Sequence, residues 1–176
     1  AAIVGADFNR DGKADVATAN PGAQGVSVLL GTGTGGFKPA VNITLGHSPV
    51  NLVAADVNAD GKLDLVTADN DIFATDGTVT VLLGNGLGGF AVAGKYAAGP
   101  DPNAVAAGDF NGDGHLDLAV PNFSNGVSTL TLLLGTGTGK FTPGGTVPTG
   151  NKPLAVAVGD FNGDGHPDLA SVSGGF

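Results

Sequence analysis

Oxygen-bearing side chains recur at fixed positions in a nine-residue segment that occurs four times in this sequence. The copies read DFNRDGKAD at residues 7–15, DVNADGKLD at 56–64, DFNGDGHLD at 109–117 and DFNGDGHPD at 160–168. Each has aspartate at positions 1, 5 and 9, asparagine at position 3 and glycine at position 6. Calcium prefers carboxylate, amide and carbonyl oxygens, and a short loop with alternating ligands can wrap them around one ion. The segments therefore predict calcium binding.

The predicted ligand shell of each loop combines side chains with one backbone oxygen. Three aspartates, one asparagine, the carbonyl at position 7 and a water would complete it if the last aspartate is bidentate. Glycine at position 6 permits the positive φ of a tight wrap, and magnesium fits less well because it requires a stricter octahedron. We expect up to four Ca2+ ions, one per loop. The predicted ligands are Asp7, Asn9, Asp11, Lys13 and Asp15; Asp56, Asn58, Asp60, Lys62 and Asp64; Asp109, Asn111, Asp113, His115 and Asp117; and Asp160, Asn162, Asp164, His166 and Asp168.

Two other interpretations of the segments need to be weighed. Without a metal they would be Asx turns that join strands, but three carboxylates in so short a loop repel one another unless a cation or protonation relieves the charge. An EF-hand or dockerin loop opens in the same way and carries a carboxylate at position 12. Position 12 holds Thr18, Thr67, Val120 and Ser171 here, which argues against such a loop.

The charge of the chain is concentrated in these segments. The formal net charge is −9, there is no glutamate, and twelve of the sixteen aspartates lie in the four loops. Four divalent ions would bring the net charge close to zero, so most of the negative charge belongs to side chains that are expected to bind cations. The seven basic residues are scattered singly, which argues against nucleic acid as a partner. No long apolar run is present to span a membrane, and the absence of cysteine excludes disulfides and thiolate metal sites.

The loops must be positioned by a repeated all-β unit. They start at residues 7, 56, 109 and 160, so the repeat is about fifty residues long, which is typical of propeller blades. The segments between them are short, β-branched and bounded by glycine, without an apolar face at helical spacing. In the second repeat we predict strands at 50–55, 63–68, 78–83 and 90–97, with the metal loop joining the first two. Four antiparallel strands of this kind make one blade.

The loop positions also predict the domain organisation. We expect one propeller segment over residues 1–176, with blade 1 at about 1–46, blade 2 at about 47–99, blade 3 at about 100–150 and half of a fourth blade at about 151–176. Pro49, Pro102 and Pro153 are expected to fix the starts of first strands, and the terminal GGF is expected to be a tail. Three and a half blades cannot close a ring and leave open edges. We therefore expect either part of a longer chain or a homo-oligomer that completes the propeller.

The four D-x-N-x-D-G-x-x-D loops and the downstream LLGxGxGxF element resemble the FG-GAP or VCBS-like repeat family. This family includes the integrin α-subunit head and many bacterial surface proteins. The resemblance covers nearly the whole chain and implies a propeller, usually of seven blades, with a calcium loop between the first two strands of each blade. It also implies an extracellular or cell-surface location, although no signal peptide is visible. The chain departs from the pattern in holding half the usual number of blades and no additional domain.

The function expected from this pattern is a non-enzymatic, calcium-stabilised module for extracellular binding or adhesion, with an unidentified protein or glycan ligand. A carbohydrate-binding lectin is the alternative, since some related propellers bind glycans between blades. A polysaccharide-active enzyme fits less well, because the chain has one tyrosine and one arginine for a catalytic face. The remaining catalytic candidates are Asp101, or Tyr96 with a histidine.

Two loops break the repeat and are candidate ligand surfaces. Residues 70–77 include Asp71, Phe73 and Asp76, and residues 122–126 include Phe123. An exposed aromatic ring beside amide and carboxylate groups suits sugar stacking. The alternative is that both are ordinary variable loops.

Glycine-rich motifs elsewhere resemble nucleotide-binding sequences. G-x-G-x-x-G occurs at residues 31–36 and 84–89, and GTGTGKF at 135–141 resembles a P-loop but has Phe141 where Ser or Thr would bind magnesium. These motifs act between a strand and a helix, and strands are predicted to follow them here. We therefore expect hairpin turns. His115 and His166 occupy loop position 7, where only the backbone is needed, so we expect their rings to face solvent.

Overall fold

The computed structural model describes residues 1–70, 76–124 and 126–174, and these form an all-β structure. Three four-stranded antiparallel sheets are followed by a two-stranded sheet, and each sheet follows the chain order of its strands. Blade 1 contains β1 (Ile3–Ala6), β2 (Asp15–Asn20), β3 (Gly25–Leu29) and β4 (Val41–Thr44). Blade 2 contains β5 (Pro49–Ala55), β6 (Asp64–Asp69), β7 (Gly77–Gly84) and β8 (Phe90–Gly99). Blade 3 contains β9 (Ala106–Gly108), β10 (Asp117–Ser124), β11 (Val127–Gly135) and β12 (Phe141–Pro148), and half-blade 4 contains β13 (Pro153–Gly159) and β14 (Asp168–Ser173).

The predicted all-β fold of about three and a half blades is confirmed. The four strands predicted in the second repeat agree with β5 to β8 to within a few residues. Pro49 and Pro153 are the first residues of β5 and β13, where a fixed φ and a missing N–H are tolerated. The same expectation for Pro102 was wrong, because β9 begins only at Ala106 and Pro102 forms an isolated bridge with Asn122. The glycine-rich motifs form the connections between third and fourth strands, with strands after them. The terminal residues 175–176, predicted to be a tail, lie outside the described part of the chain.

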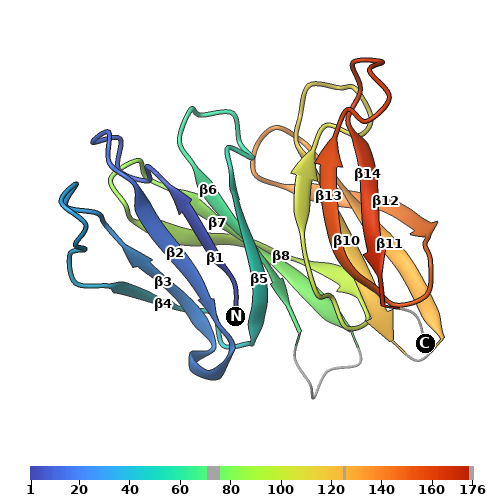
Figure 1. Cartoon of the computed structure of the whole chain (residues 1–176), viewed down its shortest axis with the longest axis horizontal. Helices are drawn as coiled ribbons and strands as arrows, with labels where there is room; N and C mark the ends of the chain where they lie inside the picture. The colour runs from blue at the N-terminus through green and yellow to red at the C-terminus, as the bar shows by residue number, and fades with distance from the viewer. Residues whose placement is uncertain (71–75, 125, 175–176) are drawn as a thin grey trace.

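The blades lie side by side in an open arc (Figure 1). The first strand of each blade lies next to the first strand of the following blade, through the contacts of β1 with β5, β5 with β9, and β9 with β13. The four nine-residue loops therefore project from the same edge of the molecule, at the top of Figure 1. Within the described residues, no helix is long and apolar enough to cross a membrane.

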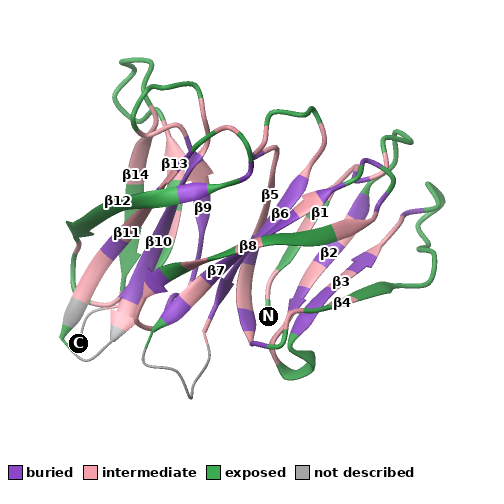
Figure 2. Cartoon of the chain, turned by 180° about the vertical axis from the view of Figure 1, so that it is seen from behind, coloured by how far each residue is buried: buried purple, intermediate pink, exposed green. Residues whose placement is uncertain are grey.

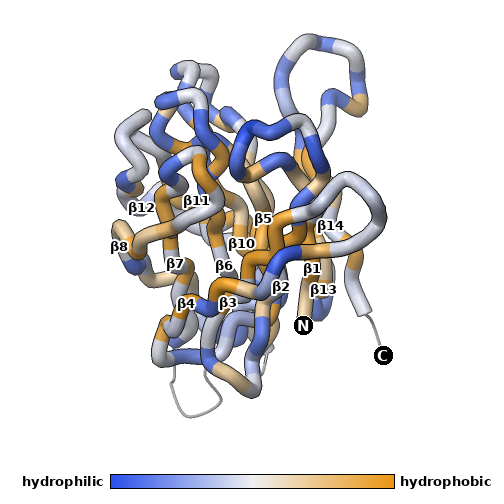
Figure 3. Tube along the Cα trace, turned by 90° about the vertical axis from the view of Figure 1, so that its left-hand side faces the viewer, coloured by the Kyte–Doolittle hydropathy of each residue, from blue (hydrophilic) through white to orange (hydrophobic). Residues whose placement is uncertain are grey.

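The core lies between the blades, not inside any one sheet. Buried side chains concentrate on the central strands, whereas the outer strands β4, β8 and β12 are mainly exposed (Figure 2). The hydropathy of the chain follows the same division, with apolar inner strands and polar loops (Figure 3). All six residues of β6 are buried because blade 2 has a neighbour on each face. One blade alone would leave these apolar faces in water, so the repeats stabilise one another.

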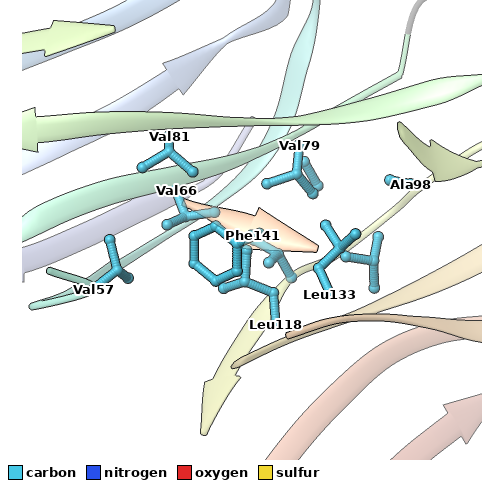
Figure 4. Packing of buried hydrophobic residues seen from close by; sticks show 11 residues of the cluster. Val57, Val66, Val79, Val81, Ala98, Leu118, Leu133 and Phe141 are labelled. Atoms are coloured by element: carbon cyan, nitrogen blue, oxygen red, sulfur yellow. The ribbon is translucent and has the colours of Figure 1, made fainter. Parts of the chain in front are cut away.

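Two apolar clusters hold the blades together. Leu52, Leu65 and Leu82 of blade 2 pack against the buried side chains of blade 1. On the other face of blade 2, a second cluster joins it to blade 3 (Figure 4) and consists mainly of Val57, Val66, Val79, Val81, Leu118, Leu133 and Phe141. Burying one Leu, Val or Phe side chain contributes roughly 1.5–3 kcal/mol. These clusters therefore fix each blade, and with it each loop, relative to the next.

The same backbone hydrogen bond occurs at both of these interfaces. The amide of Gly88, in the turn between β7 and β8, donates to the carbonyl of Phe8 in the first loop at 3.2 Å. Gly139, in the corresponding turn of blade 3, donates to the carbonyl of Val57 in the second loop, also at 3.2 Å. Each turn thus lies directly against the nine-residue loop of the preceding blade.

Candidate functional site

Each nine-residue loop joins the first and second strands of its blade and wraps around its first aspartate. In the first loop, the Asp7 carboxylate accepts the backbone N–H groups of Asp11 and Gly12 at 3.1 and 2.8 Å. Asp56, Asp109 and Asp160 accept the equivalent N–H groups in the other loops. Glycine at position 6 has φ between 78° and 85° in all four copies, as the tight wrap requires. The sequence thus folds four near-identical loops.

The side-chain oxygens of positions 1 and 3 converge in every loop. The N–H of Asp11 donates to Asp7 Oδ1 at 3.1 Å and also to Asn9 Oδ1 at 2.9 Å. The same shared N–H occurs in the other three loops. Two oxygens that accept from one hydrogen must lie side by side. In the first two loops each of these oxygens still has a lone pair for another partner. In the last two the position 1 Oδ1 atom also accepts the N–H of Gly112 or Gly163, at 2.8 and 2.7 Å, and only the asparagine oxygen keeps a lone pair. All four loops thus bring a carboxylate and an amide oxygen together at their centre.

The carboxylate at position 5 is held by its neighbours at positions 7 and 3. Asp60 accepts the N–H and the ammonium group of Lys62, at 2.9 and 2.7 Å, and these hydrogen bonds hold the pKa of Asp60 below its ordinary value. In the third loop the amide of Asn111 takes the place of the ammonium group, and the pKa of Asp113 is lowered mainly by the N–H of His115. The carboxyl group at position 5 is therefore ionised in the pH range in which calcium could bind.

The last aspartate of the loop has a structural partner that the sequence did not indicate. Asp64 is fully buried, and its two oxygens accept the N–H groups of Val57, at 3.0 Å, and of Gly84 at the end of β7, at 2.8 Å. Asp15 and Asp117 make the same pair of bonds, to Phe8 and Gly31 and to Phe110 and Gly135. Burial raises the pKa of Asp64. Position 9 thus ties the loop to the third strand of its own blade.

This bond explains the glycine that ends each LLG sequence. A Cβ at Gly31, Gly84 or Gly135 would overlap the backbone carbonyl oxygen at loop position 8, which belongs to Ala14, Leu63 or Leu116. Only glycine lets the third strand approach the loop closely enough for its N–H to reach the aspartate. The LLG glycine was the available sequence signal for this contact.

The loops fit calcium through a mixed set of oxygens. Across residues 1–70, 76–124 and 126–174, no three Asp or His side chains form a group that could hold a metal ion by themselves. The groups that do converge are the position 1 carboxylate and the position 3 amide oxygen, beside the ionised carboxylate at position 5. This donor chemistry is hard and oxygen-only, as calcium prefers. At position 9 both oxygens of Asp15, Asp64 and Asp117 already accept one backbone N–H group each, and one oxygen of Asp168 does, so its bidentate role stays a prediction.

The repeat itself matches a known family. The sequence matches the FG-GAP-like repeat model at residues 7–67, 69–120 and 122–171, and the FG-GAP repeat model at residues 102–140. The chain belongs to the FG-GAP-like repeat family. The three FG-GAP-like matches begin at the first nine-residue loop, at the end of β6 and within β10, and each includes the nine-residue loop of the following blade. Repeats of this family are typically structural modules without enzymatic activity. No curated protein matches the chain significantly.

The structure corrects one expectation for a histidine and one for an aromatic side chain in this FG-GAP-like chain, whereas His166 is exposed as expected. His115 is half-buried and packs across Gly137 in the turn of its own blade, where a Cβ would overlap the ring. Phe123 lies in strand β10 and is half-buried, with the ammonium group of Lys152 5.4 Å from the centre of its ring. It is therefore no free stacking platform for a sugar. Of the other predicted ligand loop, residues 71–75 lie outside the part that the structure describes.

Position 4 of the loops provides a test of backbone strain. Ala59 has φ of 57°, a left-handed conformation that costs a residue with a Cβ, whereas Gly112 and Gly163 occupy this position in the last two loops. We expect Ala59→Gly to stabilise the protein by about 0.5–1 kcal/mol. The reciprocal change Gly112→Ala should destabilise the protein by a similar amount. No atom lies within 4 Å of the added Cβ, so backbone strain is the only expected cost. Urea unfolding measures the change in the free energy of unfolding that each variant causes. Changes of the same sign in the two variants would show that backbone strain at position 4 is not their cause.

A second polar cluster lies at the far end of blade 2, away from the loops. Asp69, at the end of β6, is buried and accepts the hydroxyls of Thr67 and Thr80 at 2.8 and 2.6 Å. His47 Nε2 lies 3.0 Å from Asp69 Oδ2, and Lys95 Nζ lies 3.3 Å from His47 Nδ1. Blades 1 and 3 have asparagine at the equivalent position, Asn20 and Asn122, bonded to Ser27 and Thr131. The cluster pins the segment between blades 1 and 2 onto the strands of blade 2.

Burial raises the pKa of Asp69 above its ordinary value of 3.8. A raised folded-state pKa gives stability that is present below the unfolded-state pKa and is lost as the pH rises through the folded-state value. We therefore expect the free energy of unfolding of Asp69→Asn, minus that of the wild type, to increase as the pH rises above the ordinary pKa of 3.8. Urea unfolding at several pH values measures this difference. A difference that stays constant with pH would show that Asp69 does not titrate as its burial implies.

Proposed function

We propose that this FG-GAP-like chain is a calcium-binding, non-enzymatic propeller module for extracellular binding or adhesion, in which calcium has a structural role. The observation that carries the proposal is the convergence of the position 1 and position 3 oxygens in all four loops. Asp7, Asn9 and Asp11 and their equivalents would hold the ion, with the backbone carbonyl at position 7. Bound calcium would neutralise carboxylates that are concentrated at one edge of the arc.

The residues of the chain would couple this binding to folding. Asp15, Asp64 and Asp117 tie their loops to the third strands, and Phe8 and Val57 accept N–H groups from the next blade. An ion that fixes the loop therefore also fixes the interface between blades. A ligand that binds only the native state stabilises it by about 1.4 kcal/mol per site when its free concentration is tenfold above Kd. Sites in extracellular modules often have Kd near 10⁻⁴–10⁻³ M, so occupancy would follow the environment outside the cell.

Thermal unfolding with calcium and with EGTA tests the structural role. We expect EGTA to lower the melting temperature by about 3–6 °C for each site that was occupied, from about 1.4 kcal/mol per site and about 2–4 °C per kcal/mol. Magnesium at the same concentration serves as the control and should restore less of the loss. An identical melt in calcium and in EGTA would contradict the proposal.

The ligand of the module is proposed to be a protein, with glycan binding as the second candidate. One hollow on blade 1 has a volume of about 40 Å³ and is lined by Asn20, Ser27 and Asn42 among others. These three side chains are already bonded to one another, at 2.8 and 2.6 Å. A hollow this small, whose polar side chains already hydrogen-bond to one another, does not hold a sugar ring. A glycan array probed with the calcium-loaded protein separates the two candidates.

A further inference from the structure

Two of the nine-residue loops contain an Asn–Gly pair at positions 3 and 4. These pairs are Asn111–Gly112 in the third loop and Asn162–Gly163 in the fourth, and all four residues are exposed. In the first two loops Arg10 or Ala59 follows the asparagine. An asparagine loses its side-chain amide when the backbone nitrogen of the next residue attacks Cγ, and glycine hinders this attack least because it has no Cβ. The last two loops are therefore open to a reaction that the first two resist.

The hydrogen bonds of the third loop give each reacting atom a polar partner. The N–H of Gly112 donates to Asp109 Oδ1 at 2.8 Å, so the proton that this nitrogen has to lose lies against an acceptor. Asn111 Oδ1 accepts the N–H of Asp113 at 2.9 Å, and this donor stabilises negative charge on the oxygen when Cγ is attacked. Asn111 Nδ2, the atom that has to leave, donates to Asp113 Oδ2 at 2.9 Å.

The fourth loop repeats this arrangement. The N–H of Gly163 donates to Asp160 Oδ1 at 2.7 Å, and Asn162 is bonded to Asp164 through both atoms of its amide, at 2.9 and 3.0 Å. In the first two loops the asparagine oxygen accepts the equivalent N–H. Within the described part of the chain, however, the N–H at position 4 donates to the position 1 carboxylate only in the last two loops.

We propose that Asn111 and Asn162 are sites of spontaneous deamidation. In the third loop a bond forms between the Gly112 nitrogen and Asn111 Cγ, the bond from Cγ to Nδ2 breaks, and the proton of the glycine nitrogen ends on the departing ammonia. This leaves a succinimide ring. Water then adds to either carbonyl of the ring and opens it to aspartate or isoaspartate. One water is consumed and one ammonia is released, without oxidation or reduction.

Both products change the centre of the loop. Aspartate adds a negative charge at position 3, next to the carboxylates at positions 1 and 5. Isoaspartate adds a methylene group to the backbone between positions 3 and 4, so the turn around Asp109 or Asp160 no longer fits. Bound calcium would hold the position 3 oxygen and slow the reaction, an expectation that rests on the proposed function.

A third Asn–Gly pair provides a control within the same chain. Asn85–Gly86 lies in the turn between β7 and β8, where Asn85 Oδ1 accepts two backbone N–H groups. Gly86 is buried, and a Cβ there would lie 3.0 Å from the side chain of Lys62, so the backbone has little room to close a ring. Asn85 should therefore react more slowly than Asn111. Asn125–Gly126 carries no prediction, because Asn125 lies outside the described residues.

Peptide mapping by mass spectrometry, during incubation of the 176-residue chain in EGTA at neutral pH, measures deamidation at each asparagine. We expect Asn111 and Asn162 to react at least about tenfold faster than Asn9 and Asn58, which corresponds to a barrier lower by about 1.4 kcal/mol. Exchanging the residues at position 4 should move the reaction from one loop to another. Gly112→Ala should slow Asn111 by about tenfold, and Ala59→Gly should accelerate Asn58 by about tenfold. Asn162 should keep its rate in both variants.

The products and the controls separate the possible outcomes. Absence of deamidation at Asn111 and Asn162, or equal rates at the asparagines of all four loops, overturns the proposal. Aspartate without isoaspartate indicates direct hydrolysis of the amide and contradicts attack by the glycine nitrogen. A rate at Asn85 equal to that at Asn111 overturns the role assigned to the hydrogen bonds of the loop. Calcium in place of EGTA should slow both sites, and an unchanged rate leaves the modification sites standing and counts only against calcium binding.

Discussion

Gly84→Ala is expected to destabilise the protein by about 3 kcal/mol or more. The added Cβ would overlap the carbonyl oxygen of Leu63, which is backbone and cannot move without displacing the loop. The third strand would have to retreat, and the N–H of Gly84 would then lose the Asp64 carboxylate, which it reaches at 2.8 Å. Both groups are buried, so the N–H of Gly84 and one oxygen of the Asp64 carboxylate would be left without a partner, while the other oxygen keeps the N–H of Val57. Urea unfolding measures the loss.

Gly22→Ala is the matched control for this substitution. Gly22 lies in the three-residue 3-10 helix of blade 1, no atom lies within 4 Å of the Cβ position, and its φ is not positive. An alanine there should change the free energy of unfolding by less than about 1 kcal/mol. Similar losses in the two variants would show that the destabilisation comes from losing glycine in general. The close approach of strand and loop would then not be its cause.

Asp64→Asn is expected to destabilise the calcium-free protein by about 1–2 kcal/mol. An asparagine keeps one acceptor oxygen, but its amide group would face one of the two N–H donors, from Val57 or Gly84, that the carboxylate now accepts. Removing the buried charge offsets part of this loss, because burial raises the pKa of Asp64 and so penalises its ionised form. In calcium the loss should be larger, since the carboxylate also supports the ion.

Asp168→Asn distinguishes the structural role of position 9 from a general effect of charge. Asp168 is half-buried and accepts the N–H of Phe161 at 3.0 Å, and β14 is the last described strand of its sheet, so no third strand reaches the carboxylate. We expect this variant to lose less than about 0.5–1 kcal/mol in EGTA. Thermal unfolding of the two variants in EGTA compares them directly. An equal loss would mean that the bond between loop and third strand adds nothing to stability.

The architecture was accessible from the sequence because one rigid motif recurs at a regular interval. The loop at residues 56–64 has to turn the chain between two strands, and the LLG sequences mark the ends of third strands, so strand order followed from spacing alone. The segments between the nine-residue loops and the LLG sequences are β-branched, so no helix was predicted there. Leu65 and Leu82 were not assigned to an interface, since their partners are in another blade and depend on the arc.

The contacts that the sequence left undetermined are those between distant segments. Asp64 was interpreted only as a ligand, because its bond to Gly84 becomes visible only when the third strand lies against the loop. His115 was expected in solvent for the same reason, since Gly137 is brought under its ring by the turn of β11 and β12. Phe123 was expected in a loop that breaks the repeat, at residues 122–126, but pairing with β11 extends β10 through it. In each case a tertiary contact overrode the local pattern.

The most direct measurement of the central claim is a calorimetric titration of the calcium-free protein with calcium. We expect saturable binding with a stoichiometry of four ions per chain, one for each nine-residue loop, and much weaker binding of magnesium. A variant with Asp109→Asn and Asp113→Asn should bind one ion fewer, because these residues supply both carboxylates at the centre of the third loop. Absence of saturable calcium binding, or an unchanged stoichiometry in this variant, would contradict calcium binding by the nine-residue loops.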